Sequence, residues 1–250
     1  MQLTVHVFIQ SGQIAQHPTA QVSVPQGYKL IGGGASDNWV GQGNLLTASY
    51  PKGNQWIAAG KDHQDPSPSY ITVYALGLYD PDDDWEVTVA QQTSDPAEHP
   101  QAVATLPQGY TLTGGGAFVD YGSGYGNLLT ASFPNGDSGW EARSKDHLVA
   151  DPANITAYAI GVRARANNKL RLRQTIKSAT GAVAPHPSAQ VCLDSGWVLS
   201  GGGAIDNWDG EGNLLTASFP LNTCWMAKGK DHIDPSPASI TVYAIGISTE

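Results

Sequence analysis

The residues of this chain that could do chemistry recur in three short motifs of one type. Asp62 and His63 follow a lysine in a Lys-Asp-His motif, and the same motif ends at His147 and at His232. A carboxylate beside an imidazole can bind a metal ion, serve as an acid–base pair in hydrolysis, or hold a turn through hydrogen bonds. One carboxylate and one imidazole per motif leave a metal site short of ligands. We therefore favour a structural role for these pairs over ligand contact, and ligand contact over metal binding.

A second group of polar and aromatic residues precedes each motif. Asp37, Asn38 and Trp39 lie in a loop that returns through glycines to Asn44. Residues 44–62 have the alternation and the Pro/Gly/Asn turn of a β-hairpin, which places Asn44 opposite residues 61–62, within one or two positions. One constellation per copy is therefore predicted. It contains Asp37, Asn38, Trp39, Asn44, Asp62 and His63 in the first copy, Asp120, Tyr121, Asn127, Asp146 and His147 in the second, and Asp206, Asn207, Trp208, Asn213, Asp231 and His232 in the third.

Such a constellation suits a sugar. Carboxylates and amides exchange hydrogen bonds with neighbouring hydroxyls, and an indole offers a flat apolar face to a pyranose ring. A single shallow site is weak, but several sites on one rigid body raise avidity by about 10² to 10⁴. The second copy departs from the pattern at Val119, which occupies the position of Asp37, so its selectivity is expected to differ.

The constellations belong to three internal repeats. Residues 17–78 align without a gap on residues 186–247, and residues 99–162 form a looser copy. All three share GGGA, GNLLTAS, a lone tryptophan, KDH and a final IT-x-YA-x-G. We place the repeats at 1–82, 83–166 and 167–250, with four or five strands in each.

The composition supports an all-β fold. The chain has 250 residues, with 29 Gly and 16 Pro between short runs rich in Val, Ile, Thr and Tyr. The connections between repeats are short, so the repeats are expected to pack together as one domain, residues 1–250. The leading fold is a β-prism of three antiparallel sheets related by a pseudo-threefold axis, one sheet per repeat. Three independent β beads are the alternative.

Charge and hydropathy limit the partners. A net charge of -9 makes nucleic acid and anionic membrane surfaces unfavourable partners. No apolar stretch is long enough for a membrane span and no signal peptide is visible, so a cytoplasmic or non-classically secreted protein is expected. No cofactor is implied, and the oligomeric state stays open. Cys192 and Cys224 are expected to be reduced thiols rather than a disulfide.

Glycines and tryptophans have simpler interpretations. The three glycine triplets, which begin at Gly32, Gly114 and Gly201, are expected to serve the packing of the sheets more than ligand contact. Trp56 and its counterparts alternate with apolar residues and are expected in the core, whereas Trp39 and its third-repeat counterpart are equally compatible with binding and packing.

Three GGG-bearing repeats with Asp-rich loops resemble the β-prism lectins of the jacalin and griffithsin kind, and the β-prism domains of bacterial perforin-like proteins. The resemblance implies carbohydrate binding for the first group and targeting to a surface for the second. We expect a non-enzymatic, multivalent carbohydrate-binding protein that recognises glycans or glycoconjugates. A surface-targeting or structural module that binds protein or lipid is the second hypothesis, and a hydrolase that uses the Asp-His pairs is the third.

Overall fold

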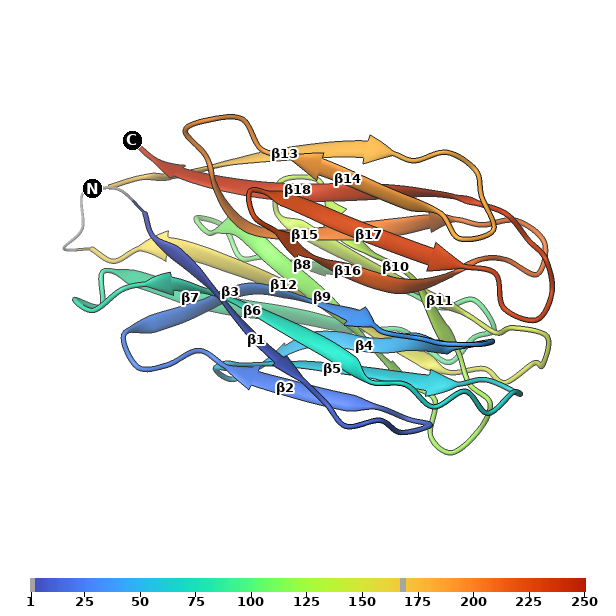
Figure 1. Ribbon diagram of the computed structural model, residues 1–250. Coiled ribbons are helices and arrows are strands. Elements are labelled where there is room, and N and C mark those ends of the chain that lie inside the picture. Colours follow the sequence, from blue (N-terminus) through green and yellow to red (C-terminus); the bar gives the residue numbers. More distant parts are fainter. Residues whose placement is uncertain (1–2, 167–169) are drawn as a thin grey trace.

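The computed structural model describes residues 3–166 and 170–250, in which every regular element is a β-strand (Figure 1). Each repeat has six strands instead of the expected four or five, because a five-residue strand ahead of the glycine triplet is too short to stand out in the sequence. The strands of the first repeat are β1 (Val5–Ser11), β2 (Thr19–Ser23), β3 (Tyr28–Asp37), β4 (Asn44–Lys52), β5 (Gln55–Asp62) and β6 (Ile71–Tyr79). Those of the second are β7 (Trp85–Thr93), β8 (Gln101–Thr105), β9 (Thr111–Asp120), β10 (Leu128–Asn135), β11 (Gly139–Lys145) and β12 (Asn154–Ala164). Those of the third are β13 (Leu172–Thr180), β14 (Ser188–Cys192), β15 (Val198–Asn207), β16 (Leu214–Leu221), β17 (Cys224–Lys230) and β18 (Ser239–Thr249).

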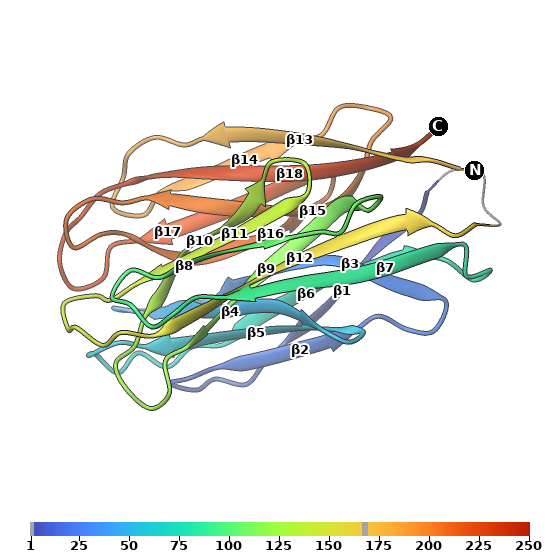
Figure 2. The ribbon, with the colours of Figure 1, turned by 180° about the vertical axis from the view of Figure 1, so that it is seen from behind.

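The strands of the described residues form three antiparallel six-stranded sheets, as the predicted prism requires (Figure 2). Their strand orders are β1-β6-β3-β16-β17-β14, β2-β5-β4-β9-β12-β7 and β13-β18-β15-β10-β11-β8. The prediction of one sheet per repeat is wrong, because every sheet takes three strands from one repeat and three from another. Independent beads are excluded for the same reason.

The exchange follows a cycle. We call the strands β2-β5-β4, β8-β11-β10 and β14-β17-β16 the arms of the first, second and third repeats. The first arm pairs with β9 through Ser49 and Ala117, and the second and third arms pair in the same way with β15 and β3. Each arm therefore completes a sheet of the next repeat, and the third arm returns to the first repeat.

The glycine triplets allow strands of different repeats to pack this closely against each other. A Cβ on Gly116 would lie 2.3 Å from the carbonyl oxygen of Ser49 in the arm of the preceding repeat. A Cβ on Gly115 would lie 2.2 Å from Cδ2 of Trp140. The first glycine of each triplet meets the backbone of another repeat in the same way. The expected structural role of the triplets is confirmed.

The tryptophan that follows each hairpin turn is buried in the core, as expected. Trp56, Trp140 and Trp225 are at most 1% exposed. Each indole Nε1 donates a hydrogen bond of 2.8 to 2.9 Å to a serine hydroxyl of its own arm. The indole of each arm thus fills the space above a glycine and satisfies its polar atom at the same time.

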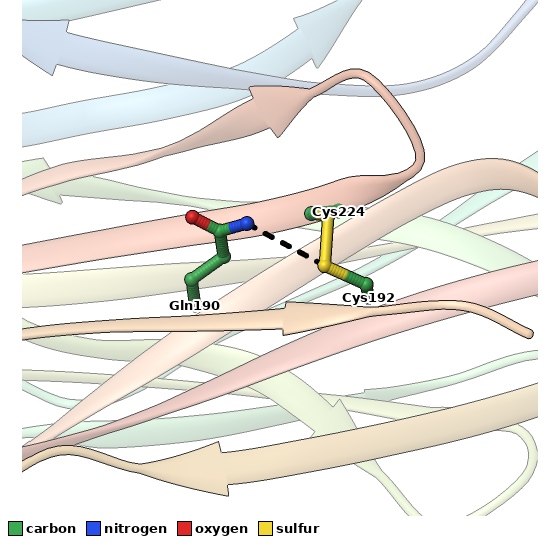
Figure 3. Close-up of a disulfide and its surroundings, with 3 residues drawn as sticks. All are labelled: Gln190, Cys192 and Cys224. Atoms are coloured by element: carbon green, nitrogen blue, oxygen red, sulfur yellow. Dashed lines mark hydrogen bonds between the residues drawn. A yellow bond between two sulfur atoms is a disulfide. The ribbon is translucent and has the colours of Figure 1, made fainter.

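The expectation of two reduced thiols is wrong, because Cys192 and Cys224 form a disulfide (Figure 3). The two residues face each other in the β14–β17 ladder, with their Cα atoms 3.9 Å apart. Gln190 Nε2 lies 3.4 Å from the Cys192 sulfur. The bridge fastens the edge strand of the third arm; it was the less favoured alternative, because β14 itself was not recognised.

The connection between β6 and β7 joins the first repeat to the second. Strand β6 ends at Tyr79 and β7 begins at Trp85, so the boundary after residue 82 lies in the turn between them. The Asp80 carboxylate holds this turn by accepting hydrogen bonds from the backbone N–H groups of Asp84 and Trp85. The second boundary, after residue 166, adjoins residues 167–169, which lie outside the described residues.

The loops that follow β3 and β5, and their counterparts in the other repeats, gather at one end of the molecule, opposite the start of β1 (Figure 1). We call this the loop end; it comprises residues 38–43, 63–70, 121–127, 146–153, 208–213 and 231–238. Every predicted site residue lies on these loops or on the strand ends next to them.

Candidate functional site

The three imidazoles of the Lys-Asp-His motifs meet at the centre of the loop end. Nε2 of His63 lies 2.6 Å from the carbonyl oxygen of His147, Nε2 of His147 lies 2.7 Å from that of His232, and Nε2 of His232 lies 2.7 Å from that of His63. The rings are at most 1% exposed, and their centroids are 5.3 to 5.6 Å apart. This closed ring of contacts ties the three repeats together, which fits the structural role that we favoured.

The same arrangement disfavours the chemical alternatives. Burial lowers the pKa of His63 to about 4, although the hydrogen bond to His147 O opposes this effect, and burial also lowers the pKa values of His147 and His232. The Asp62 carboxylate turns away from the His63 ring to bind Asn44 and a backbone N–H, so the Asp-His pair does not form the hydrogen bond that a hydrolase would use. Within the described residues, no group of three or more His, Cys, Asp or Glu side chains could hold a metal ion.

The asparagine of each GNLL segment anchors the Lys-Asp-His loop. Asn44 is fully buried and pairs with Asp62 in the β4–β5 ladder, as the hairpin predicted. Its amide donates to Asp62 Oδ1 and to the backbone oxygen of Gln16 at 3.2 Å, while Asp62 Oδ2 accepts the N–H of Ser67 at 2.9 Å. Asn127 with Asp146 and Asn213 with Asp231 repeat the pair. Each of the three asparagines thus holds the Lys-Asp-His loop of its own repeat in place.

The lysine of each motif, which the sequence analysis did not single out, joins its repeat to the next one. Lys61 Nζ donates to the carbonyl oxygen of Gly124 at 2.9 Å and lies 4.3 Å from the ring centre of Tyr121. Its presence in all three motifs was the available signal, but the contact crosses between repeats and no local pattern reveals it. The counterparts are Lys145 with Glu211 O and Trp208, and Lys230 with Gln42 O and Trp39.

These lysines are buried. Burial lowers the pKa of Lys145 and of Lys230 to about 8, and nearby carboxylates oppose the shift. A cation over an aromatic face that also donates to a carbonyl oxygen is a strong and directional link between repeats. Together with the three imidazoles, the lysines fix the positions of the aromatic loops.

Two predicted site residues are buried acids that find too few hydrogen-bond donors among the described residues. Asp37 is 5% exposed; its Oδ1 accepts the Ser69 hydroxyl at 2.6 Å, whereas its Oδ2 has no partner. Both carboxylate oxygens of Asp206 are without a partner, and so are the side-chain oxygens of Asn44 and Asn213. Burial raises the pKa of Asp37 to about 7 and that of Asp206 to about 8, and the charges of Asp62 and Asp231 add to these shifts.

In the second repeat, the side-chain oxygen of the equivalent asparagine has a donor, and no acid occupies the position of Asp37. Val119 replaces Asp37, and Ser144 replaces the glycine at position 60. The Ser144 hydroxyl donates to Asn127 Oδ1 at 2.8 Å. In the first repeat, Asp37 Oδ2 and Asn44 Oδ1 both face the space beside Gly60, so a proton on the Asp37 carboxyl group would supply the donor that Ser144 supplies in the second repeat.

This protonation predicts a pH dependence of stability. Folded Asp37 keeps a proton up to about pH 7, whereas the unfolded chain releases it near pH 4, so its contribution to stability is lost as the pH rises through this window. Asp62 and Lys230 are the charged groups that face it.

The variant Asp37→Asn carries an uncharged donor at every pH. It should match the wild type at pH 4 and exceed it at pH 8 by on the order of 3 to 4 kcal/mol in urea unfolding. Asp120→Asn, at an exposed position, is the control, and parallel pH profiles for wild type and Asp37→Asn would refute the assignment.

Exchanging the residues of one repeat for those of another tests the same contact. A Cβ on Gly60 would lie 2.6 Å from Asp37 Oδ2 and 3.0 Å from Asn44 Oδ1. Gly60→Ser alone should therefore destabilise the protein by about 2 kcal/mol. Adding Asp37→Val reproduces the pair of the second repeat and should restore most of the loss. A double-mutant cycle by urea unfolding measures the coupling, and additive effects of the two changes would contradict the prediction.

Trp39 and Trp208 form aromatic walls at the junctions between repeats. Both are half-buried, and each lies against a histidine of the preceding repeat in the cycle, at ring distances of 5.3 Å to His186 and 5.4 Å to His99. The place of these histidines beside the indoles was not predicted from the sequence, because the contacts join different repeats. Both packing and exposure are therefore present at these tryptophans.

The remaining loop residues differ between repeats. The Asn38 amide donates to Thr72 Oγ1 at 3.1 Å, and the Asn207 amide donates to Thr241 Oγ1 at 3.0 Å. In the second repeat Asp120 is exposed, and Tyr121 takes the place of the indole beneath the lysine of the first repeat.

Surface cavities lie where the second repeat meets the third and where it meets the first. One of about 340 Å³ lies between the second and third repeats, lined by His99, Gln101, Arg143, Asn207 and Trp208 with Asp206 beside them. Another, of about 290 Å³, shares His99 and contains Asp146. A cavity of about 410 Å³ between the first and second repeats is lined by His17, Asp62 and Tyr125. The predicted residues that line these three cavities are Asp62, Asp146, Asp206, Asn207 and Trp208.

Comparison with known proteins does not assign the chain to a family. No protein-family model matches the chain, and no curated protein sequence is significantly similar to it. In the described part of the chain, no helix has the length and apolar character needed to cross a membrane.

Proposed function

We propose that the protein is a non-enzymatic, multivalent carbohydrate-binding protein whose sites are the cavities at the junctions between repeats. The observation that carries the proposal is the cavity of about 340 Å³ between the second and third repeats. It combines one indole with the amides of Gln101 and Asn207 and the guanidinium of Arg143. An aromatic wall with a few polar groups around it is the composition that sugar recognition requires.

Trp208 contacts a buried lysine and also lines the cavity. The Lys145 ammonium lies 4.8 Å from the centre of its ring, and Lys145 does not line this cavity. The indole is therefore held in place by the lysine while it also borders the cavity. A wall fixed in this way loses little side-chain entropy when a ligand binds, which favours affinity.

The three junctions are similar but unequal. Trp39, Tyr121 and Trp208 provide the aromatic walls, and the arm position of Arg143 is occupied by Ala59 in the first repeat and Lys228 in the third. A surface that presents many copies of a glycan would engage the junctions together, and this arrangement raises avidity without strong single sites. The tyrosine junction is expected to bind more weakly than the two tryptophan junctions.

A glycan array followed by calorimetric titration of the best sugar tests the proposal. The variant Trp39→Ala/Trp208→Ala should weaken binding at least about fivefold, in line with an aromatic contact of about 1 kcal/mol or more at each site. Trp197→Ala is the matched control, because this half-buried indole lies outside the junction cavities. Absence of any glycan ligand for folded protein, or equal loss in the control, would reject the proposal.

Surface targeting is a second candidate, favoured by apolar side chains exposed near the loop end. Ile14, Tyr125, Leu148 and Ile233 are 41 to 71% exposed there. Apolar groups gathered at one end of a rigid body suit contact with a lipid or protein surface. Sedimentation with phosphatidylcholine vesicles that is lost in Leu148→Ser/Ile233→Ser, and cell binding that survives removal of glycans, would favour this candidate.

A further inference from the structure

Each sheet carries a pair of aromatic rings on its face at the line where two repeats meet. Tyr158 stacks on Tyr50 with ring centres 5.2 Å apart and an angle of 25°. Tyr74 with Phe219 and Tyr243 with Phe133 repeat the stacking. The rings flank the third glycine of each triplet, which has no side chain of its own, so the pair has a structural role in all three sheets.

The pair between the first and second repeats has additional features. Phe118 adds a third ring, 5.3 Å from that of Tyr50, where the other repeats have Ser36 and Ile205. The three rings line a cavity of about 440 Å³, with Lys52, Val89 and Gln91 at its rim. A volume of this size is within the range of small-molecule sites.

The phenol groups at this cavity are available to a ligand. In the described part of the chain, neither the Tyr50 hydroxyl nor the Tyr158 hydroxyl makes a hydrogen bond to another group. Burial raises the pKa of both, and each therefore stays a neutral donor and acceptor at physiological pH. The amide of Gln91 and the ammonium of Lys52 are both exposed at the rim.

The equivalent place between the second and third repeats is covered. The guanidinium of Arg143 lies 5.4 Å from the ring centre of Phe133, held by an ion pair with Glu141. Phe133 is consequently only 8% exposed. In the first repeat Ala59 and Ile57 occupy the positions of these two charged residues, so the rings there stay open.

We propose that Tyr50, Phe118 and Tyr158 form a second kind of binding site, on the flank of the molecule, which takes a neutral pyranose ring. The stacked rings offer a flat apolar surface to one C–H face of the sugar, and the phenol and amide groups at the edge bind its hydroxyls. Val89, 44% exposed, leaves the site open on one side, which suits a ligand whose other face stays hydrated. The site is separate from the junction cavities and does not depend on them.

Fluorine NMR of protein labelled with 3-fluorotyrosine resolves the two kinds of site. Methyl glucoside, galactoside and mannoside are the probes, and each resonance is assigned by a Tyr→Phe substitution. The Tyr50 and Tyr158 resonances should shift together with one dissociation constant. Those of Tyr121 and Tyr125 report the junction between the same two repeats, and Tyr243 reports the covered flank and should not move with the same constant.

Two variants test the mechanism while keeping the fold. Ile57→Glu/Ala59→Arg places the Arg143–Glu141 pair over the open rings and should weaken flank binding more than tenfold. Tyr158→Phe keeps the stacking and should weaken binding by about two- to tenfold, read from Tyr50, whereas Tyr243→Phe should change nothing.

The outcomes separate the two proposals. Shifts at Tyr121 and Tyr125 without shifts at the flank would overturn the flank site and leave the junction sites standing. Shifts at the flank alone would support the flank site and count against the junctions. Flank binding that survives the covering variant would overturn the flank proposal.

Discussion

Replacing Gly115 with alanine is expected to lower the free energy of unfolding by about 3 kcal/mol or more. The new methyl group would lie 2.2 Å from Cδ2 of Trp140 and 2.3 Å from the carbonyl oxygen of Tyr158. The indole cannot retreat easily, because it is 1% exposed and its Nε1 is bonded to Ser132. Overpacking of a filled core usually costs about 1 to 3 kcal/mol, and a clash with both an indole and the backbone belongs at the upper end.

Gly136→Ala separates this steric effect from backbone strain. Gly136 has a φ of 67° but no atom within 4 Å of a Cβ, so alanine there should cost only about 1 kcal/mol. Both variants are measured by urea unfolding at one pH. Combining Gly115→Ala with Trp140→Phe should recover part of the loss, since the smaller ring makes room. Equal effects of the two glycine substitutions would show that packing against the indole is not what selects glycine at position 115.

Removing the disulfide is expected to have an effect of similar size. Cys192 and Cys224 are 32 residues apart, and closing a loop of this length stabilises a protein by about 3 to 4 kcal/mol in the chain-entropy model. Cys192→Ser/Cys224→Ser should lower the free energy of unfolding by this amount. The first arm is a natural comparison, because Gln55 binds the Ser23 hydroxyl at 3.0 Å at the equivalent place and no bridge exists there.

The measurement is urea unfolding of the serine variant beside the wild type with and without dithiothreitol. The reduced wild type should behave like the variant, and the oxidised wild type should be more stable than both. An unfolding midpoint of the oxidised protein that does not change on reduction would contradict the prediction. Hydrogen exchange should locate the loosened amides in β14 and in the end of β17.

The sequence predicted the parts of the molecule that depend on local pattern. The hairpin from Asn44 to Asp62, the buried tryptophans and the all-β class follow from alternation and turn residues, which act within a few positions. The short strand β2 was missed because five residues with one buried side chain carry little periodic signal. The disulfide was missed with it, since the pairing of β14 and β17 is what opposes the two cysteines.

Pairing between repeats could not be predicted. Strand β4 pairs with β9, but β10 and β16 have nearly the same sequence as β4, so a local pattern cannot say which partner belongs to which arm. The same ambiguity hid the contact of Lys61 with a loop more than 60 residues away. The candidate site was therefore predicted in its composition, and only in part in its geometry. Of the residues expected to meet a ligand, Asn44 anchors the Lys-Asp-His loop of its own repeat, and His63 connects the repeats.

The cyclic exchange of arms has a consequence for biosynthesis. One edge of β3 pairs with β6, and the other pairs only with β16, which a ribosome makes near the end of the chain. The first repeat must therefore wait, with one strand edge unpaired, until more than 170 further residues have been added, counted from Asp37 to Leu214. Contacts of such long sequence separation form slowly and expose the nascent chain to wrong partners, among them an arm from a neighbouring copy. A chain that closed with a neighbour's arm would be an intertwined oligomer with the same local contacts as the monomer.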